Sequence, residues 1–230
     1  MQIVQPMLLL ATDTSGKNGS IALARVTPGQ GGVEIVELVP LAGGTFSAQL
    51  VPQISALLEK HGYSKSDLAG FAVVYGPGSF TGLRVGLAAI KALAEVLRKP
   101  ICAVSLLEAV AWSGKARGRV LAALDAGRSQ VYVGDYQVDS QAHMLSERLL
   151  SWEEFVAESH EKTVITPDAG LAEIARAAGI PVEQISYPDS QVIARLGWSR
   201  LERGETVSPD ALDANYIRRS DAEIFSKPKH

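Results

Sequence analysis

The stretch of sequence that bears most on chemistry is rich in glycine and runs from Gly76 to Arg84, reading Gly-Pro-Gly-Ser-Phe-Thr-Gly-Leu-Arg. It follows an apolar run that predicts a strand and opens a segment that predicts a helix, where free backbone N–H groups attract anions. Its spacing, G-x-G-x-x-x-G with no following lysine, matches neither a Walker A loop nor a dinucleotide fingerprint. The alternative is a tight turn in which Ser79 or Thr81 caps the helix. Gly78 and Ser79 are candidate anion contacts, although spacing alone favours the turn.

A second group of polar residues stands at the ends of two apolar runs. Asp13, Thr14 and Ser15 follow the first run, and Asp125 ends a comparable run in the second half of the chain. In nucleotide-binding proteins built from two similar lobes, the first such loop faces phosphate or a metal ion. The alternative is ordinary turn chemistry, since Asp and Ser favour turns through local hydrogen bonds. Asp13, Thr14 and Ser15 are therefore candidate contacts for a nucleotide or anion.

The remaining reactive residue types are too scattered to build a metal centre or a nucleophile with its base. The four histidines form no H-x-x-x-H or H-E-x-x-H pair, so no helix offers two imidazoles to a metal ion. The single cysteine, Cys102, lies in an apolar run that predicts a buried strand, and no G-x-S-x-G motif occurs. The sequence therefore predicts no metal site and no catalytic residue, which makes a peptidase a poor interpretation.

Small residues recur at helical spacing after the glycine-rich turn, at Gly82, Gly86 and Ala89. Each glycine weakens a helix by roughly 0.8–1 kcal/mol relative to alanine, so two of them indicate a steric requirement. Small side chains let another helix or backbone approach closely. That partner is either the helix predicted from Phe46 to His61 in the same lobe or a helix of another chain.

The pattern of apolar residues predicts an α/β protein with two similar lobes. The first half reads as an antiparallel meander followed by helix, strand, helix and strand, with its main elements at 7–13, 20–26, 33–40, 46–61, 71–75 and 81–98. The second half varies this theme, with elements at 120–125, 130–137, 164–166, 168–178 and 190–203. We expect two lobes of the actin/Hsp70 (ASKHA) type, at 1–104 and 105–230, each a mixed sheet with flanking helices.

Composition limits the partners that the chain can bind by itself. The 230 residues carry a formal net charge of -3, which argues against a broad basic face. If the protein acts on nucleic acid, another protein supplies most of the phosphate contacts. The first ten residues lack the basic segment of a signal peptide, and no membrane span is predicted. A cytoplasmic protein fits these features.

The motifs described above resemble those of the TsaB (YeaZ) family of bacterial tRNA threonylcarbamoyladenosine synthesis. The landmarks appear in family order and span nearly the whole chain. They are Asp13-Thr14-Ser15, the stretch from Gly76 to Arg84, Val104-Ser105-Leu106, the stretch from Leu124 to Arg128 with Val131-Tyr132, and the stretch from Asn215 to Glu223. One departure is Phe46-Ser47, where family members often have His-Ser.

The resemblance implies a subunit that is not an enzyme alone. Such proteins pair with TsaD, a catalytic paralogue with a metal-binding histidine pair, to modify the adenosine next to the anticodon of tRNAs that read codons beginning with A. TsaE is an ATPase of the same system. The resemblance also implies dimerisation through the first-lobe helices. We therefore assign the partner interface to Phe46, Leu50, Ile54, Gly82, Arg84, Gly86, Ala89 and Ile90.

Two hypotheses follow. The leading one is a pseudo-enzyme that scaffolds or activates a TsaD-like partner, touches tRNA only through the complex and forms a homodimer when alone. It needs no cofactor, although ATP or ADP could sit at the partner interface. The alternative is a nucleotide-binding ATPase or phosphotransferase of the same superfamily, which needs Asp13 and Asp125 to face a metal-bound phosphate.

Overall fold

The computed structural model describes residues 6–29 and 32–217, which form two compact units. The first unit contains the chain up to residue 109 together with residues 187–214. The second contains residues 110–186 and the described residues from 215 onward. The chain thus enters the second unit and then returns to the first.

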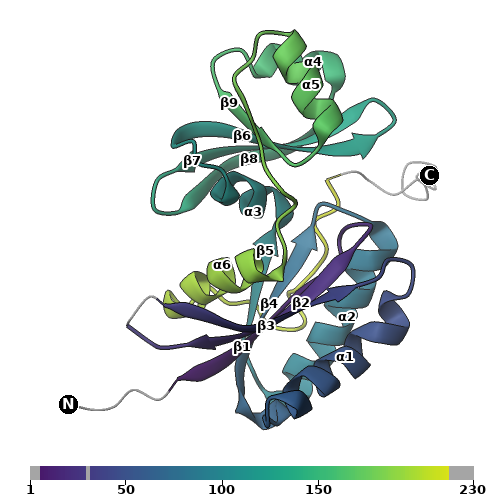
Figure 1. Cartoon of the computed structure of the whole chain (residues 1–230), viewed down its shortest axis with the longest axis vertical. Helices are drawn as coiled ribbons and strands as arrows, with labels where there is room; N and C mark the ends of the chain where they lie inside the picture. The colour runs from purple at the N-terminus through teal and green to yellow at the C-terminus, as the bar shows by residue number, and fades with distance from the viewer. Residues whose placement is uncertain (1–5, 30–31, 218–230) are drawn as a thin grey trace, which may run out of the picture. The chain divides into compact units, whose positions relative to one another are not determined.

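A five-stranded mixed sheet forms the centre of the first unit (Figure 1). Its strand order is β3-β2-β1-β4-β5, and the strands are β1 (Met7–Asp13), β2 (Gly19–Val26), β3 (Val33–Leu41), β4 (Leu68–Gly76) and β5 (Ile101–Ser105). The first three strands form the predicted antiparallel meander. β4 and β5 run parallel to β1, so their carboxyl ends meet at one edge of the sheet.

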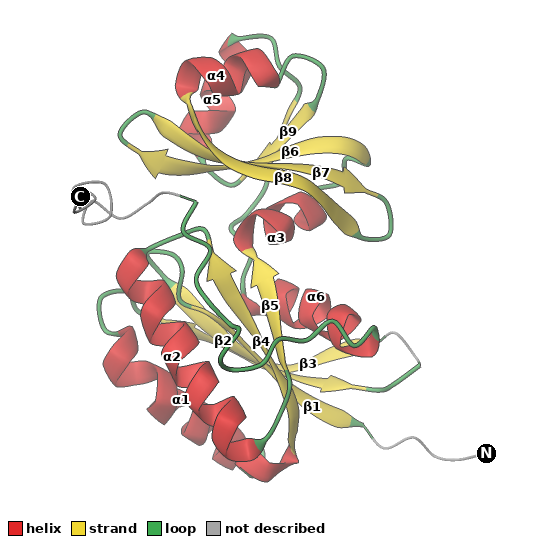
Figure 2. Ribbon diagram, turned by 180° about the vertical axis from the view of Figure 1, so that it is seen from behind, coloured by secondary structure: helices red, strands yellow, loops and turns green. Residues whose placement is uncertain are grey.

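Helices cover both faces of this sheet. α1 (Phe46–Lys60) and α2 (Phe80–Leu97) lie side by side on one face, where Leu10, Leu50 and Ile90 belong to one apolar core. α6 (Ser190–Glu202) lies on the other face (Figure 2). A short 3-10 helix (Lys65–Asp67) leads into β4, and α3 (Leu106–Ser113) follows β5.

The position of α6 corrects the predicted domain boundary. We expected residues 105–230 to form the second lobe, yet α6 packs on the sheet of the first unit. The physical reason is that β1 and β4 are apolar on both faces, and α1 and α2 cover only one of them. At Gly197, an added Cβ would lie 2.3 Å from the Cβ of Ala72, so α6 approaches the sheet very closely.

The second unit repeats the arrangement of strands. Its sheet has the order β10-β9-β6-β7-β8, with β6 (Gly118–Gly127), β7 (Gln130–Val138), β8 (Ala142–Ser151), β9 (Thr163–Thr166) and β10 (Val182–Gln184). α4 (Trp152–Glu158) and α5 (Ala169–Ala177) cover one face through Phe155, Leu171 and Ala175. The predicted pair of mixed sheets with flanking helices is therefore confirmed, while β8 and β10 were not predicted.

Among the described helices, none has both the length and the apolar character needed to cross a bilayer.

Candidate functional site

The loop after β1 and the glycine-rich turn after β4 form one structural unit. The backbone N–H of Ser79 donates a hydrogen bond to the carbonyl oxygen of Ser15 at 2.7 Å. The hydroxyl of Thr14 donates to the carbonyl oxygen of Gly82, also at 2.7 Å. Both contacts arise because β1 and β4 are neighbouring parallel strands, so the segments that follow them leave the same edge of the sheet.

The glycines in this turn make room for the loop of residues 13–15. A Cβ added at Gly82 would lie 2.1 Å from the carbonyl oxygen of Thr14, and one added at Gly86 would lie 2.3 Å from the Thr14 hydroxyl. A Cβ at Gly78 would lie 2.5 Å from the carbonyl oxygen of Ser15. Each distance is far below a van der Waals contact, so a side chain at any of these positions would force the loop to shift.

This packing corrects the interpretation of the small-residue stripe. We assigned Gly82 and Gly86 to a partner interface because small residues let another helix approach. Both are buried, and the space beside them is filled by Thr14 of the same chain. The spacing did signal a close approach, but the approaching segment is a loop 68 residues away in the sequence.

The interpretation of Ser79 as a helix cap is also confirmed, because Ser79 is the N-cap of α2. Its hydroxyl accepts a hydrogen bond from the N–H of Gly82 at 3.3 Å. The N–H of Ser79 is itself engaged by Ser15. Two of the N–H groups that an anion would need at this helix start are therefore used within the chain.

Asp13 is a buried carboxylate that is held by its own loop. Its Oδ1 accepts hydrogen bonds from the N–H of Ser15 at 2.8 Å and from the Ser15 hydroxyl at 2.6 Å. Burial raises the pKa of Asp13, while the hydrogen bonds from Ser15 oppose this and the nearby carboxylate of Asp189 adds to it. In the described part of the chain, no three side chains of the metal-binding types come together as a site.

Asp125 has a comparable place in the second unit and a different environment. Its side chain is exposed and accepts a hydrogen bond from the N–H of Gly127 at 2.8 Å. Its own N–H donates to the carboxylate of Asp168 at 2.8 Å. Asp125 thus stabilises the hairpin turn that follows, which agrees with the turn chemistry considered from the sequence.

Most of the apolar residues assigned to the partner interface belong to the core. Phe46, Leu50, Ile54 and Ile90 are 6%, 1%, 4% and 0% exposed, so their side chains are unavailable to a partner in this conformation. The physical reason is that the apolar stripe of an amphipathic helix is the side that covers its own sheet. Of the predicted interface residues, Arg84 is exposed and Ala89 is partly exposed.

The opposite sides of α1 and α2 form a continuous outer surface, which we call the helical face. Its members are the exposed residues Ser47, Ala48, Val51, Pro52, Gln53, Ser55, Ala56, Glu59, Lys60, Phe80, Thr81, Arg84, Ala88, Ala92, Glu95 and Val96. Val51 is 50% exposed and Val96 is 78% exposed. Most of these residues are small or apolar, whereas the solvent side of a surface helix is normally charged. The small share of charged residues on this face is the signal that sequence analysis overlooked.

An aromatic residue lies at the start of this face. Phe80 is 39% exposed, and the guanidinium carbon of Arg84 lies 3.6 Å from the centre of its ring. Such a stacked pair keeps both side chains ordered at the surface. Arg and aromatic residues are enriched where proteins bind one another.

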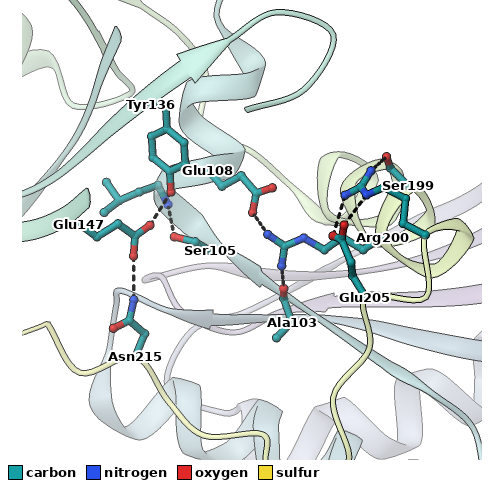
Figure 3. A network of polar contacts seen from close by, with 11 residues as sticks. Ala103, Ser105, Glu108, Tyr136, Glu147, Ser199, Arg200, Glu205 and Asn215 are labelled. Atoms are coloured by element: carbon teal, nitrogen blue, oxygen red, sulfur yellow. Dashed lines mark hydrogen bonds and ion pairs between the residues drawn. The ribbon is translucent and has the colours of Figure 1, made fainter. Parts of the chain in front are cut away.

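An ion pair fixes α6 and α3 to the first sheet (Figure 3). The guanidinium of Arg200 donates to the carbonyl oxygen of Ala103 and to the carboxylate of Glu108, the latter at 2.5 Å. Within the second unit, Glu147 on β8 accepts hydrogen bonds from the Tyr136 hydroxyl at 2.5 Å and from the Asn215 amide at 2.8 Å. Asn215 begins the last sequence landmark, whose residues 218–223 lie outside the described part of the chain.

Residues 38–199 match the family model described as TsaD: tRNA N6-adenosine threonylcarbamoyltransferase. Several relatives carry the name tRNA threonylcarbamoyladenosine biosynthesis protein TsaB, among them the following two. The Escherichia coli protein is 27% identical over 94% of this chain and 96% of its own length. The Bacillus subtilis protein is 38% identical over 57% of this chain and only 56% of its own length. The chain belongs to the TsaB (YeaZ) branch of the TsaD family.

Solved structures agree with this membership. A Pseudomonas aeruginosa protein described as similar to peptidase YeaZ superposes with a TM-score of 0.73 and 27% identity, over 92% of this chain and all of that one. YeaZ from Pseudomonas aeruginosa superposes with a TM-score of 0.71 and 25% identity, over 91% of this chain and 99% of that one. The expected architecture of two actin/Hsp70-like lobes is therefore confirmed for this TsaB-family chain.

Proposed function

We propose that this chain is the non-catalytic partner that pairs with a TsaD-like paralogue and activates it for threonylcarbamoylation of tRNA adenosine. The observation that carries the proposal is the helical face, where two packed helices expose Val51, Ala88 and Val96 in place of charged residues. Contiguous apolar surface on a soluble domain is typical of a protein-binding site.

Pairing through the helical face fits what stable interfaces require. A standard interface buries roughly 1,600 Å² in total, or about 800 Å² from each partner. The exposed sides of a 15-residue and an 18-residue helix would form one partner's side of such an interface. Phe80 stacked with Arg84 supplies an ordered aromatic anchor at one end of the face.

Activation without a reactive group of its own is the mechanism that we infer. A subunit that binds one conformation of its partner more tightly shifts the partner's population toward that conformation. The two candidate catalytic carboxylates are already engaged within the chain. Asp13 accepts a hydrogen bond from its own loop, and Asp125 accepts one from its own turn. In the absence of the paralogue, the same face would support a homodimer. Contact with tRNA would come through the complex, and a TsaE-like ATPase would be a further member.

The deciding experiment disrupts the helical face without touching the core. Ala88→Glu places a charge at its exposed centre, and Ala177→Glu places the same charge on an exposed position of α5 as a control. We expect Ala88→Glu to weaken pairing with the matched TsaD-like protein at least 10-fold in calorimetry and to lower tRNA modification equally. The control should behave like the wild type. Full modification by the TsaD-like protein in the absence of this chain would refute the proposal.

A nucleotide at the partner interface is a separate proposal and needs its own experiment. Calorimetry with Mg-ATP is carried out on the isolated chain, on the pair with the TsaD-like protein, and on both with the Asp13→Ala variant. Binding that requires the pair would support a shared nucleotide. Turnover by the isolated wild-type chain, lost in the Asp13→Ala variant, would instead favour the phosphotransferase alternative.

A further inference from the structure

The tip of the β1–β2 hairpin, residues 14–19, is packed against other parts of the first unit. Connecting segments normally run over the protein surface, where they tolerate change. Here Thr14 and Ser15 are buried, because glycines of two other segments approach the tip closely. These segments lie where α1 and α2 begin, and those two helices form the helical face. The contacts of the tip therefore bear on that surface.

Thr14 connects the hairpin tip to α2. Its hydroxyl donates a hydrogen bond to the carbonyl oxygen of Gly82 at 2.7 Å, and a Cβ added at Gly86 would lie 2.3 Å from the same hydroxyl. Both glycines stand inside a helix, where glycine is unfavourable. The close approach of the tip, and not helix propensity, explains why they are there.

A different part of the hairpin tip contacts the start of α1. Gly43 lies in the loop that leads from β3 into this helix, and a Cβ added there would lie 1.8 Å from the carbonyl oxygen of Lys17. A Cβ added at Gly19 would lie 2.9 Å from the ring of Phe46, the first residue of α1. Little space separates the tip from either group, so a displaced tip would displace the start of α1.

One segment thus contacts the starts of two neighbouring helices. α1 and α2 lie side by side on the same face of the sheet (Figure 2). A close-packed structure transmits a displacement instead of absorbing it, so the position of the hairpin tip sets the spacing between the two helices. The core of a protein interface is packed as tightly as a protein interior. A change in this spacing would therefore reduce the fit of a partner to the helical face.

We propose that the hairpin tip is a positioning element for the helical face, which holds α1 and α2 at the spacing that a partner requires and does not touch the partner itself. Thr14 and Lys17 are its positioning residues. This inference rests on the proposed function, since it concerns the same surface. Energetic coupling between two sites is reciprocal, so a partner bound to the helical face also stabilises the packed tip.

The first test displaces the hairpin tip at each of its two contacts. Gly43→Ala places a methyl group against the carbonyl oxygen of Lys17, and Gly86→Ala places one against the Thr14 hydroxyl. Neither glycine belongs to the exposed residues that define the helical face. We expect each variant to weaken pairing with the matched TsaD-like protein at least 10-fold in calorimetry, at a temperature where circular dichroism shows that it is folded. Wild-type affinity in both folded variants would overturn the proposal.

Three control variants separate position from stability and from direct contact. In Gly16→Ala the methyl group would meet only the tip's own backbone, 3.1 Å from the carbonyl oxygen of Asn18. Arg200→Met lowers stability from the other face of the sheet, and Lys17→Glu reverses an exposed charge. All three should pair at the wild-type level. A 10-fold loss in Arg200→Met would mean that stability alone explains the effect, and the same loss in Lys17→Glu would mean that the partner touches the tip. Either result would contradict the proposal.

Hydrogen–deuterium exchange of the wild-type protein tests the reciprocal effect and does not depend on the folding of any variant. Exchange of residues 14–19 is compared between the monomeric chain and its pair with the TsaD-like protein. We expect pairing to slow this exchange at least 5-fold, although these residues lie outside the helical face. Unchanged exchange there, in a pair that protects α1 and α2, would also overturn the proposal. If the wild-type chain forms no pair at all, the proposed function fails instead.

Discussion

The hydroxyl of Thr14 donates a hydrogen bond to the carbonyl oxygen of Gly82, and this contact fixes the first turns of α2 against the loop that follows β1. Thr14 is 3% exposed, so the bond is shielded from water. The helical face lies on the opposite side of the same helix. The position of that face, and hence the geometry it offers to a partner, depends on how closely the loop and the helix approach each other.

The glycines beneath this contact should be intolerant of alanine, and unequally so. In Gly82→Ala the new Cβ meets a backbone oxygen at 2.1 Å, whereas in Gly86→Ala it meets a side-chain hydroxyl at 2.3 Å that can rotate away. We expect Gly86→Ala to lower the free energy of unfolding by about 1–3 kcal/mol and Gly82→Ala by more. Urea denaturation measures both values.

Gly170 in α5 is the matched control for these substitutions. No atom would lie within 4 Å of a Cβ added there. Because alanine is the better helix former, Gly170→Ala should raise the free energy of unfolding by up to about 1 kcal/mol. Equal effects at Gly82 and Gly170 would mean that the loop does not occupy the space beside α2.

Removing the Thr14 hydroxyl should be milder. Thr14→Val keeps the shape of the side chain and loses one buried hydrogen bond, so we expect a loss of about 1 kcal/mol. Thr14→Ser keeps the hydroxyl and should recover part of that loss. Denaturant midpoints of the two variants provide the comparison, and a valine variant as stable as the wild type would contradict the assigned contact.

The stability of the chain should carry a pH signature from Asp13. Its pKa is raised in the folded state, chiefly by burial, so folding favours the protonated form. The contribution of Asp13 to the free energy of unfolding is therefore largest below its unfolded pKa of about 3.9. It is lost as the pH rises through the raised pKa of the folded state. Asp13→Asn, which still accepts hydrogen bonds from Ser15, should be the more stable protein at pH 7. The difference in the free energy of unfolding between this variant and the wild type should vanish near pH 4. A difference that grows as the pH falls would contradict the raised pKa of Asp13.

Replacing Arg200 should lower the stability of the protein because Glu108 would lose its ion-pair partner Arg200. Its loss would remove the cation that faces the carboxylate of Glu108, whose side chain is 9% exposed. Breaking a buried pair typically costs about 3–5 kcal/mol, and the 25% exposure of the Arg200 side chain places the expected loss for Arg200→Met at about 2–3 kcal/mol. The double variant with Glu108→Leu should recover most of this loss. Thermal unfolding of the single and double variants tests the coupling.

The thiol of Cys102 should be inert until the first unit unfolds. The side chain is fully buried, and burial raises its pKa to about 11. We expect no labelling by a thiol reagent at pH 8 in the native protein and complete labelling in urea. Rapid labelling under native conditions would show that β5 is accessible, which the packing of α6 does not allow.

Several parts of the fold followed from local patterns. The apolar runs ending at Asp13 and Asp125 predicted buried strands, because strands covered on both faces read as continuous apolar segments. The four-residue spacing of Phe46, Leu50 and Ile54 predicted α1. The polar residues at the start of the second helix predicted a cap at Ser79 or Thr81, and the structure has it at Ser79. The family resemblance came from the same short motifs and was confirmed.

The sequence by itself determined most of the strands and helices, although not α3, β8 or β10, and it determined that a close contact exists at Gly82 and Gly86. Only the tertiary structure decided what makes that contact. A glycine in the sequence indicates that another group comes close, but it does not indicate which group this is. The same holds for α6, which joins the first unit because the sheet there has an uncovered face. It also holds for the helical face, since an apolar stripe reveals which side of a helix is buried only once the sheet beneath it is in place.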